Sequence, residues 1–173
     1  MKTFYIASGL GNAEQTRMLA ARLKAAGWGQ TYDWTKHGAV DSKEDLQRVS
    51  QLEMKGAMEA ELVIVLLPGG RGTHTELGMA LASGNQVLIN DETGEAFNTG
   101  EETCSFYHHP AVWKTALDIE CLATMLTLPD KFGKMFAHIF THINLFAQKL
   151  KHLGEKSIER RCNDETQAKP QGD

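Results

Sequence analysis

The chain has 173 residues, a length typical of one domain built around one hydrophobic core. Its composition is that of an ordinary globular protein, and a formal net charge of -4 argues against a basic surface for nucleic acid. The N-terminal apolar stretch is too short for a secretory signal, no apolar run reaches the length of a membrane span, and three unpaired cysteines fit a reducing compartment. We therefore expect a cytoplasmic protein with neither a nucleic-acid nor a membrane partner.

Short apolar runs alternate with helical patterns over the first 90 residues. The run over 62–67 is continuously apolar, as expected of a central parallel strand that is covered on both faces. Glycines mark the turns, and Gly27 marks the end of the first helix. The expected strands lie over 3–7, 31–34, 62–67 and 86–90, and the expected helices over 12–26, 41–60 and 73–83.

The second half of the chain is less regular. We expect an edge strand over 104–107 and helices over 112–127 and 130–153. The last helical pattern, within residues 128–153, has a wide apolar face that includes Phe132, Phe136 and Phe140, which favours packing on the domain or on a partner subunit. Residues 154–173 are polar and weakly patterned, as in a flexible tail.

This order of elements predicts one fold class. Strands that alternate with helices form a doubly wound α/β domain of the flavodoxin or Rossmann-like kind, here with a five-stranded parallel sheet over 1–127 and an extra C-terminal helix. Ligands of such domains bind beyond the carboxyl ends of the strands. The turns after the first and third strands are therefore the expected place of a site.

A glycine-rich motif, PGGRGTHTE over 68–76, lies between the most apolar strand and a helix. Its glycines let backbone N–H groups approach a ligand closely, and the helix start adds partial positive charge, so an anion such as phosphate is favoured. The expected phosphate-binding residues are Gly69, Gly70, Arg71, Gly72 and Thr73. Arg71 strengthens this preference if it faces the ligand and contributes nothing if it faces solvent.

Two carboxylates and a phenol are the candidate catalytic groups. Glu76 follows the glycine-rich turn, Glu53 lies on the preceding helix and Tyr5 lies on the first strand. A carboxylate pair suits chemistry at a sugar carbon, where one group stabilises or attacks an oxocarbenium-like centre and the other protonates the leaving group. Each residue also has a possible structural role without catalysis. Glu76 could form a capping box, Glu53 could be a solvated surface charge and Tyr5 could be a core residue.

Three further residues lie at expected strand ends and are candidate substrate contacts. Asp33 and Trp34 end the short second strand, where the indole could stack on a base. Asp91 follows the fourth strand, at the carboxyl edge of the sheet.

Three segments together resemble the nucleoside 2-deoxyribosyltransferase family, which includes deoxynucleoside 5'-monophosphate N-glycosidases. These are KTFYIASG over 2–9, Glu53 before ELVI, and GTHTELGMAL over 72–81. The resemblance covers roughly residues 1–127. It implies that Glu76 is the nucleophile at the anomeric carbon and that Tyr5 orients it. It also implies that Glu53 serves the leaving base, although the family usually has aspartate there. The turn that contacts sugar or phosphate would fall on Ser8 and Gly9.

The resemblance implies cleavage of the N-glycosidic bond of a 2'-deoxynucleoside or its 5'-monophosphate through a glutamyl-linked sugar, with transfer to another base or to water. It also implies a homodimer or larger homo-oligomer and no cofactor. His138 and His142 have a spacing that can bind zinc, but no third ligand is evident, so we expect no metal.

Two other functions remain open. The motif PGGRGT with Glu76 also resembles the cytokinin-activating phosphoribohydrolases, which release bases from nucleoside monophosphates. That family has an arginine at the position of Glu53. Because this sequence lacks the arginine, the resemblance to the deoxyribosyltransferase family is the favoured interpretation. The second alternative is a nucleotide-sensing module that uses the glycine-rich turn but not the acid pair.

Overall fold

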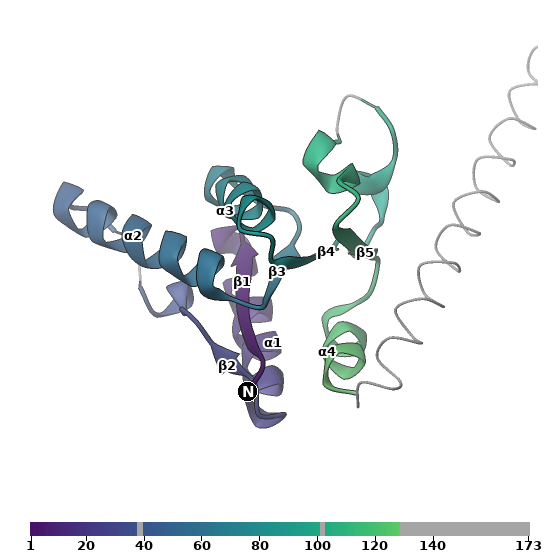
Figure 1. The fold of residues 1–173 in the computed structure, drawn as a ribbon, viewed down its shortest axis with the longest axis horizontal. Helices are drawn as coiled ribbons and strands as arrows, with labels where there is room; N and C mark the ends of the chain where they lie inside the picture. Colours follow the sequence, from purple (N-terminus) through teal and green to yellow (C-terminus); the bar gives the residue numbers. More distant parts are fainter. Residues whose placement is uncertain (38–39, 101–102, 129–173) are drawn as a thin grey trace, which may run out of the picture.

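The computed structural model describes residues 1–37, 40–100 and 103–128, which form a parallel sheet with helices on both faces (Figure 1). The five strands lie in the order β2-β1-β3-β4-β5. This confirms the predicted doubly wound α/β class. The strands are β1 Thr3–Ser8, β2 Gly29–Gln30, β3 Leu62–Leu66, β4 Gln86–Asn90 and β5 Val112–Thr115. The helices are α1 Ala13–Ala25, α2 Lys43–Glu59, α3 Arg71–Ala82 and α4 Ile119–Thr127.

The strand order reverses between β1 and β3, which pair in parallel from Phe4 with Leu62 to Ser8 with Leu66. The chain turns outward from β1 to β2 and then returns past β1 to β3, so the connections on either side of this pair leave toward opposite faces of the sheet. Crevices at such a reversal are the usual ligand sites of doubly wound sheets. The fold therefore directs attention to the residues around β1 and β3.

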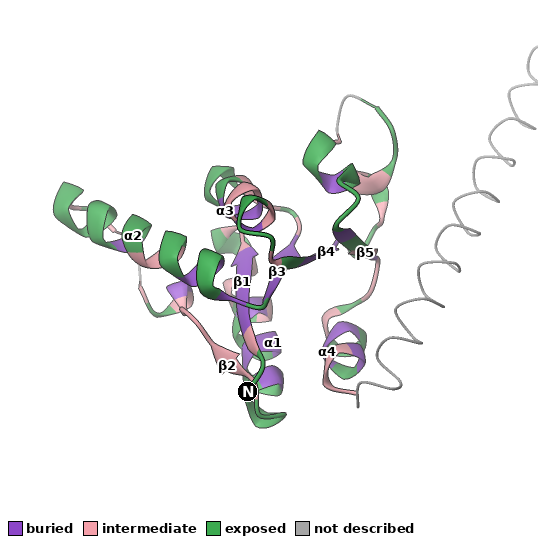
Figure 2. Ribbon diagram, viewed as in Figure 1, coloured by how far each residue is buried: buried purple, intermediate pink, exposed green. Residues whose placement is uncertain are grey.

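The central strands β1, β3 and β4 are mostly buried (Figure 2). Alternation along them divides the core into two layers. Phe4 and Ile6 of β1 pack in the layer that contains Leu19 of α1 and Leu122 of α4. Tyr5 and its alternating neighbours pack in the other layer, beneath α2 and α3. A polar group on the α2 and α3 side of β1 is therefore enclosed between two helices and the sheet.

The second strand is shorter and earlier than predicted. It spans Gly29–Gln30, and Trp34 instead begins a short 3-10 helix, Trp34–Lys36. A local cap and a long-range contact together override the strand preference of this segment. Asp33 caps the helix by accepting from the Thr35 N–H, and the Trp34 indole N–H donates to the Ile6 carbonyl at 2.8 Å.

The prediction for the fifth strand is wrong. Residues 104–107 fall largely in a 3-10 helix, Ser105–His108, whereas the edge strand is Val112–Thr115, where a helix is expected from the pattern. Asn90 explains the difference, because its side-chain carbonyl accepts from the Thr115 hydroxyl at 2.9 Å and from the Leu117 N–H at 3.1 Å. These bonds hold the segment extended beside β4, and the helix begins only after Asp118 caps it.

The predicted helix over 130–153 and the predicted tail over 154–173 lie outside the described residues. Cys104 and Cys121 carry free thiols. Within residues 1–37, 40–100 and 103–128, no helix combines the length and the apolar character that crossing a membrane requires.

Candidate active site

Tyr5 and Glu76 form a buried hydrogen bond between the sheet and α3. The phenol of Tyr5 donates to Oε1 of Glu76 at 2.7 Å. Tyr5 is fully buried and Glu76 is 7% exposed. Burial raises the pKa of Glu76 to about 7, the bond from Tyr5 opposes this rise, and the charge of Glu53 adds to it. The side chain of Glu76 is thus oriented by a neutral donor and ionises near neutral pH.

Glu76 does not cap its helix. The helix α3 begins at Arg71, two residues before the expected start, and its N-cap is Gly70. The capping contact belongs to Thr73, whose hydroxyl accepts from the Gly70 N–H at 3.1 Å. Because Glu76 lies beyond the first turn and bonds to Tyr5, its carboxylate is not used to cap the helix.

Glu53 brings a second carboxylate to the same place from α2. Its side chain is half-buried, and burial raises its pKa, with the charge of His37 opposing the rise. The charge of Glu53 also contributes to the raised pKa values of Glu76 and Tyr5, after burial as the main cause in both. Glu53 and Glu76 therefore interact electrostatically from two neighbouring helices.

Gly56 permits this close approach of α2. A β-carbon at this position would lie 2.6 Å from Cβ of Tyr32 and 3.1 Å from Cδ2 of Tyr5. Glu53 lies one turn earlier, on the same face of the helix. The glycine thus lets the helix face that carries Glu53 pack directly on the two tyrosines.

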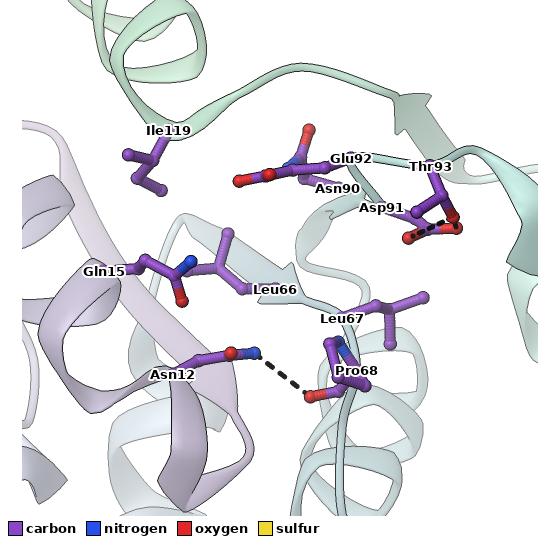
Figure 3. A pocket seen from close by; sticks show the side chains of 10 residues that line it. All are labelled: Asn12, Gln15, Leu66, Leu67, Pro68, Asn90, Asp91, Glu92, Thr93 and Ile119. Carbon is purple, nitrogen blue, oxygen red and sulfur yellow. Dashed lines mark hydrogen bonds between the residues drawn. The ribbon is translucent and has the colours of Figure 1, made fainter.

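The two expected phosphate turns contact each other. A β-carbon on Gly9 would lie 3.1 Å from the Pro68 carbonyl oxygen. Asn12 donates to that carbonyl at 3.1 Å (Figure 3). It also donates to the Ser8 hydroxyl at 2.9 Å, and Ser8 donates to the Leu66 carbonyl at 2.9 Å. The structure therefore brings Ser8 and Gly9 together with the start of the glycine-rich turn.

The glycine-rich turn is tightly built. A β-carbon on Gly69 would lie 2.7 Å from Cγ2 of Thr73, which is buried. Gly70, Arg71 and Gly72 are exposed at the start of α3. The Gly70 N–H is bonded to the Thr73 hydroxyl, whereas the amides of Arg71 and Gly72 lie in the first turn of α3, where backbone N–H groups have no carbonyl partner within the helix.

His74 fastens this turn to the loop after β4, a contact that the sequence patterns did not single out. Its Nδ1 lies 2.7 Å from the Gly70 carbonyl oxygen, and its Nε2 lies 2.6 Å from the Tyr107 hydroxyl. Because a carbonyl only accepts, Nδ1 carries a proton, and in the neutral ring Nε2 accepts from the phenol. The two rings are also stacked, with centroids 5.7 Å apart.

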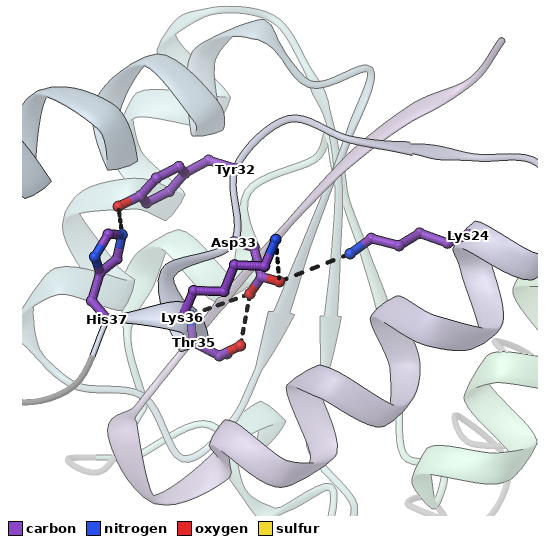
Figure 4. A network of polar contacts seen from close by, with 6 residues as sticks. All are labelled: Lys24, Tyr32, Asp33, Thr35, Lys36 and His37. Carbon is purple, nitrogen blue, oxygen red and sulfur yellow. Dashed lines mark hydrogen bonds and ion pairs between the residues drawn. The ribbon is translucent and has the colours of Figure 1, made fainter.

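Asp33 and Trp34 do not join the acid pair. Trp34 is buried against β1, and Asp33 lies 3.8 Å from the ammonium groups of both Lys24 and Lys36 (Figure 4). The aromatic residue of this segment that packs against α2 is instead Tyr32, which lies close to Gly56 and whose phenol is hydrogen-bonded to Nε2 of His37. The aromatic character of the segment was visible in the sequence, but which aromatic ring faces α2 depends on the 3-10 turn.

Asp91 is buried at the end of β4 and serves the local backbone. Its carboxylate accepts from the Thr93 hydroxyl and, at 2.9 Å, from the Ala96 N–H. It also lines a cavity of about 190 Å³ between the start of α1 and the ends of β3 and β4 (Figure 3). A second cavity, of about 570 Å³, is lined by residues that include Lys24, Tyr32 and His37. Neither cavity is lined by Tyr5, Glu53 or Glu76.

The described residues hold no group of three or more histidine, cysteine, aspartate or glutamate side chains that could bind a metal ion. Tyr5, Glu53 and Glu76 offer two carboxyl groups of raised pKa and a buried phenol.

The comparisons with known proteins support the fold. No family model matches the sequence, and no curated protein is similar to it. Among solved structures, the chain is similar to the CMP N-glycosidase BcmB of Clostridium botulinum, with a TM-score of 0.51 and 20% sequence identity. The match covers 73% of this chain and 100% of that chain. At this identity the likeness establishes a shared doubly wound architecture.

Proposed function

We propose that the protein cleaves the N-glycosidic bond of a 2'-deoxynucleoside or its 5'-monophosphate and that Glu76 is the nucleophile. The observation that carries this proposal is the buried 2.7 Å bond from Tyr5 to Glu76, with Glu53 electrostatically coupled to both. A retaining glycosyl transfer uses two such groups, an oriented carboxylate as the nucleophile and a second carboxyl of raised pKa as the acid and base.

In the first step, an oxygen of ionised Glu76 attacks the anomeric carbon and the bond from that carbon to the base nitrogen breaks. The electron pair of that bond leaves with the base, which takes a proton from Glu53. In the second step, water or another base attacks the same carbon and gives a proton to Glu53, and Glu76 is released as a carboxylate. The two steps return both side chains to their starting states.

Ribonucleoside 5'-monophosphates are a second class of candidate substrate. The structurally similar BcmB is named for its action on CMP, a ribonucleotide. A 5'-phosphate also suits the exposed start of α3 at Gly70, Arg71 and Gly72. We propose that the amides of Arg71 and Gly72 and the Arg71 guanidinium face the phosphate.

We further propose that the enzyme works as a homodimer or larger homo-oligomer in the cytoplasm. The resemblance to the deoxyribosyltransferase family, which implies such an assembly, supports this proposal. Sedimentation of the full chain at micromolar concentration tests this proposal, and a monomer would contradict it.

The test of the function is chromatographic detection of free base. The full chain is incubated with a panel of deoxynucleosides, deoxynucleoside 5'-monophosphates and their ribose counterparts, each with and without a second base. Base release that requires the second base indicates a transferase, and release without it indicates a hydrolase. Release by wild type that is lost in Glu76→Ala supports the proposal.

A different pattern would support one of the alternatives. Release that is confined to ribonucleoside monophosphates and survives Glu53→Gln would favour a phosphoribohydrolase. Nucleotide binding that persists in Glu76→Ala, with no release by wild type, would favour a sensor module.

A further inference from the structure

The segment after β2 is fastened to both the sheet and α2. The Thr31 hydroxyl lies 2.8 Å from the Gly56 carbonyl oxygen of α2 and 3.2 Å from the Phe4 carbonyl oxygen of β1. The Thr31 N–H also donates to the Phe4 carbonyl at 3.0 Å. These contacts fix the position from which the next side chain, Tyr32, reaches α2.

Tyr32 packs against the helix face that holds Glu53 and is hydrogen-bonded to His37. Its Cβ is so close to Gly56 that a β-carbon there would lie 2.6 Å away, and Glu53 lies one turn earlier on that face. The Tyr32 phenol is hydrogen-bonded to Nε2 of His37, and the two rings stack with centroids 5.6 Å apart and an interplanar angle of 26° (Figure 4). Two contacts therefore restrain the imidazole, a hydrogen bond and a ring stack.

We propose that Tyr32 and His37 act together as a positioning pair for Glu53. Held by Tyr32, the imidazolium form of His37 stabilises the carboxylate that Glu53 becomes when it gives its proton to the departing base. This inference rests on the proposed function, in which Glu53 serves the leaving group. It adds an electrostatic partner for that step that the sequence patterns did not indicate.

The surrounding charges agree with this assignment. Burial raises the pKa of Glu53, and His37 is the group that opposes the rise. Burial also raises the pKa of Tyr32, followed by the charge of Glu53, while Arg48 opposes the rise and Asp33 adds to it. Tyr5 on β1 and Glu76 on α3 both interact with the charge of Glu53, and Asp45 on α2 interacts with that of His37.

The charge of His37 acts on Glu53 in both steps of the reaction. A positive charge near Glu53 favours the ionised carboxylate, so it assists proton donation to the base. In the second step the same charge makes Glu53 a weaker base toward the proton of the attacking water or base. His37 therefore sets how readily Glu53 gives up its proton and takes it back, and its loss changes the pH range in which Glu53 can act.

The first experiment follows the titration of the Glu53 carboxyl by carbon NMR in the full chain, with Glu53→Gln to assign the resonance. In His37→Gln we expect the Glu53 titration to move to higher pH by roughly half a unit, because a positive neighbour is lost. Tyr32→Phe keeps the ring but removes the hydrogen bond that holds His37, so it should move the titration in the same direction by less. Lys36→Gln removes a positive charge that lies on the Asp33 side of the same segment and should leave the Glu53 titration in place.

The second experiment measures base release against pH for the same variants. The limb on which activity falls as Glu53 loses its proton should move to higher pH in His37→Gln, with kcat reduced roughly 10-fold and KM little changed. An unmoved Glu53 titration in both His37→Gln and Tyr32→Phe, with the fold intact by NMR, would overturn the inference.

The two experiments separate this inference from the proposed function. If wild type releases no base from any substrate, the proposed function fails and the catalytic role of the pair fails with it, whatever the Glu53 titration shows. If wild type is active but neither the titration nor the pH limb responds to His37, the function stands and only the inference fails.

Discussion

Tyr5 and Glu76 are 71 positions apart in the chain and share a buried hydrogen bond of 2.7 Å. The phenol lies on the strand next to the reversal of the sheet, and the carboxylate lies on the helix that follows the glycine-rich turn. The bond is donated by a group whose own pKa is raised, chiefly by burial, so the phenol remains neutral and remains a donor. This relationship keeps a nucleophilic carboxylate oriented inside the protein.

Tyr5→Phe should slow the reaction and move its pH dependence. The bond from Tyr5 lowers the pKa of Glu76, so its loss leaves burial and Glu53 to raise that pKa further above about 7. Because the nucleophile must be ionised, the acid limb of kcat/KM should move to higher pH. Initial rates of base release between pH 5 and 9 measure this shift, and an unchanged limb with an intact fold would contradict the assignment.

The stability of the protein should fall as the pH rises toward neutrality. Glu76 has a folded pKa of about 7 against an ordinary value of 4.5, so the folded state holds more protons in this interval. The free energy of unfolding should therefore decrease between these two pH values, by on the order of 3 kcal/mol from this group, and level off above them. Urea unfolding at several pH values measures the slope.

Glu76→Gln supplies the control for that slope. The amide keeps the shape of the side chain without a titrating proton. The variant should show a flatter dependence of stability on pH and should be more stable than wild type at pH 8. An identical slope in both proteins would show that Glu76 titrates in its ordinary range.

Glu53 should matter most when the leaving base needs a proton. Glu53→Gln should reduce kcat by about 10² to 10⁴-fold for natural bases, the range typical of a lost general acid. The loss should be much smaller for a synthetic glycoside whose leaving group departs as a stable anion. Glu53→Asp, which introduces the residue usual in the resembling family, should retain more activity than Glu53→Gln. Equal losses for both kinds of leaving group would argue against an acid role.

Gly56→Ala should disturb the site through packing alone. The new β-carbon would meet Cβ of Tyr32 at 2.6 Å and the ring of Tyr5 at 3.1 Å, so the helix or the tyrosines must shift. We expect a loss of about 1 to 3 kcal/mol in unfolding free energy, as for other overpacked cores, together with reduced activity. Thermal unfolding compares the two proteins.

Gly78→Ala is the matched control for that substitution. Gly78 lies inside α3, and a β-carbon there meets no atom within 4 Å apart from its own helix and chain neighbours. The same change should stabilise the protein by about 0.5 to 1 kcal/mol, because alanine is the better helix former. Stabilisation by Gly56→Ala of the same size would show that α2 is not in close contact with the tyrosines.

Periodicity and glycine placement predicted the fold class and most of the elements near the site. The continuous apolar run at 62–67 and the turn at 68–72 indicated β3 and the start of α3, because each has a strong local cause in the sequence. The edge strand Val112–Thr115 was missed because its conformation depends on side-chain bonds from Asn90, 25 positions away. Local patterns carry no information on such a partner.

The candidate site was predictable to a similar extent. The resemblance selected Tyr5, Glu53 and Glu76, and the structure brings these side chains together between β1, α2 and α3. It did not select Tyr32, because the orientation of that ring depends on a tight turn and on the absence of a side chain at Gly56. Contacts of this kind arise only once two distant segments are packed.

The most direct test of the account is mass spectrometry of a trapped sugar on the enzyme. An analogue with an electron-withdrawing 2'-fluorine slows both steps, because the transition states have oxocarbenium character. The account predicts an adduct with the mass of the sugar or sugar phosphate on the peptide that contains Glu76, and no such adduct in Glu76→Gln. Base release that continues in Glu76→Gln, with no adduct on wild type, would contradict the central claim that Glu76 is the nucleophile.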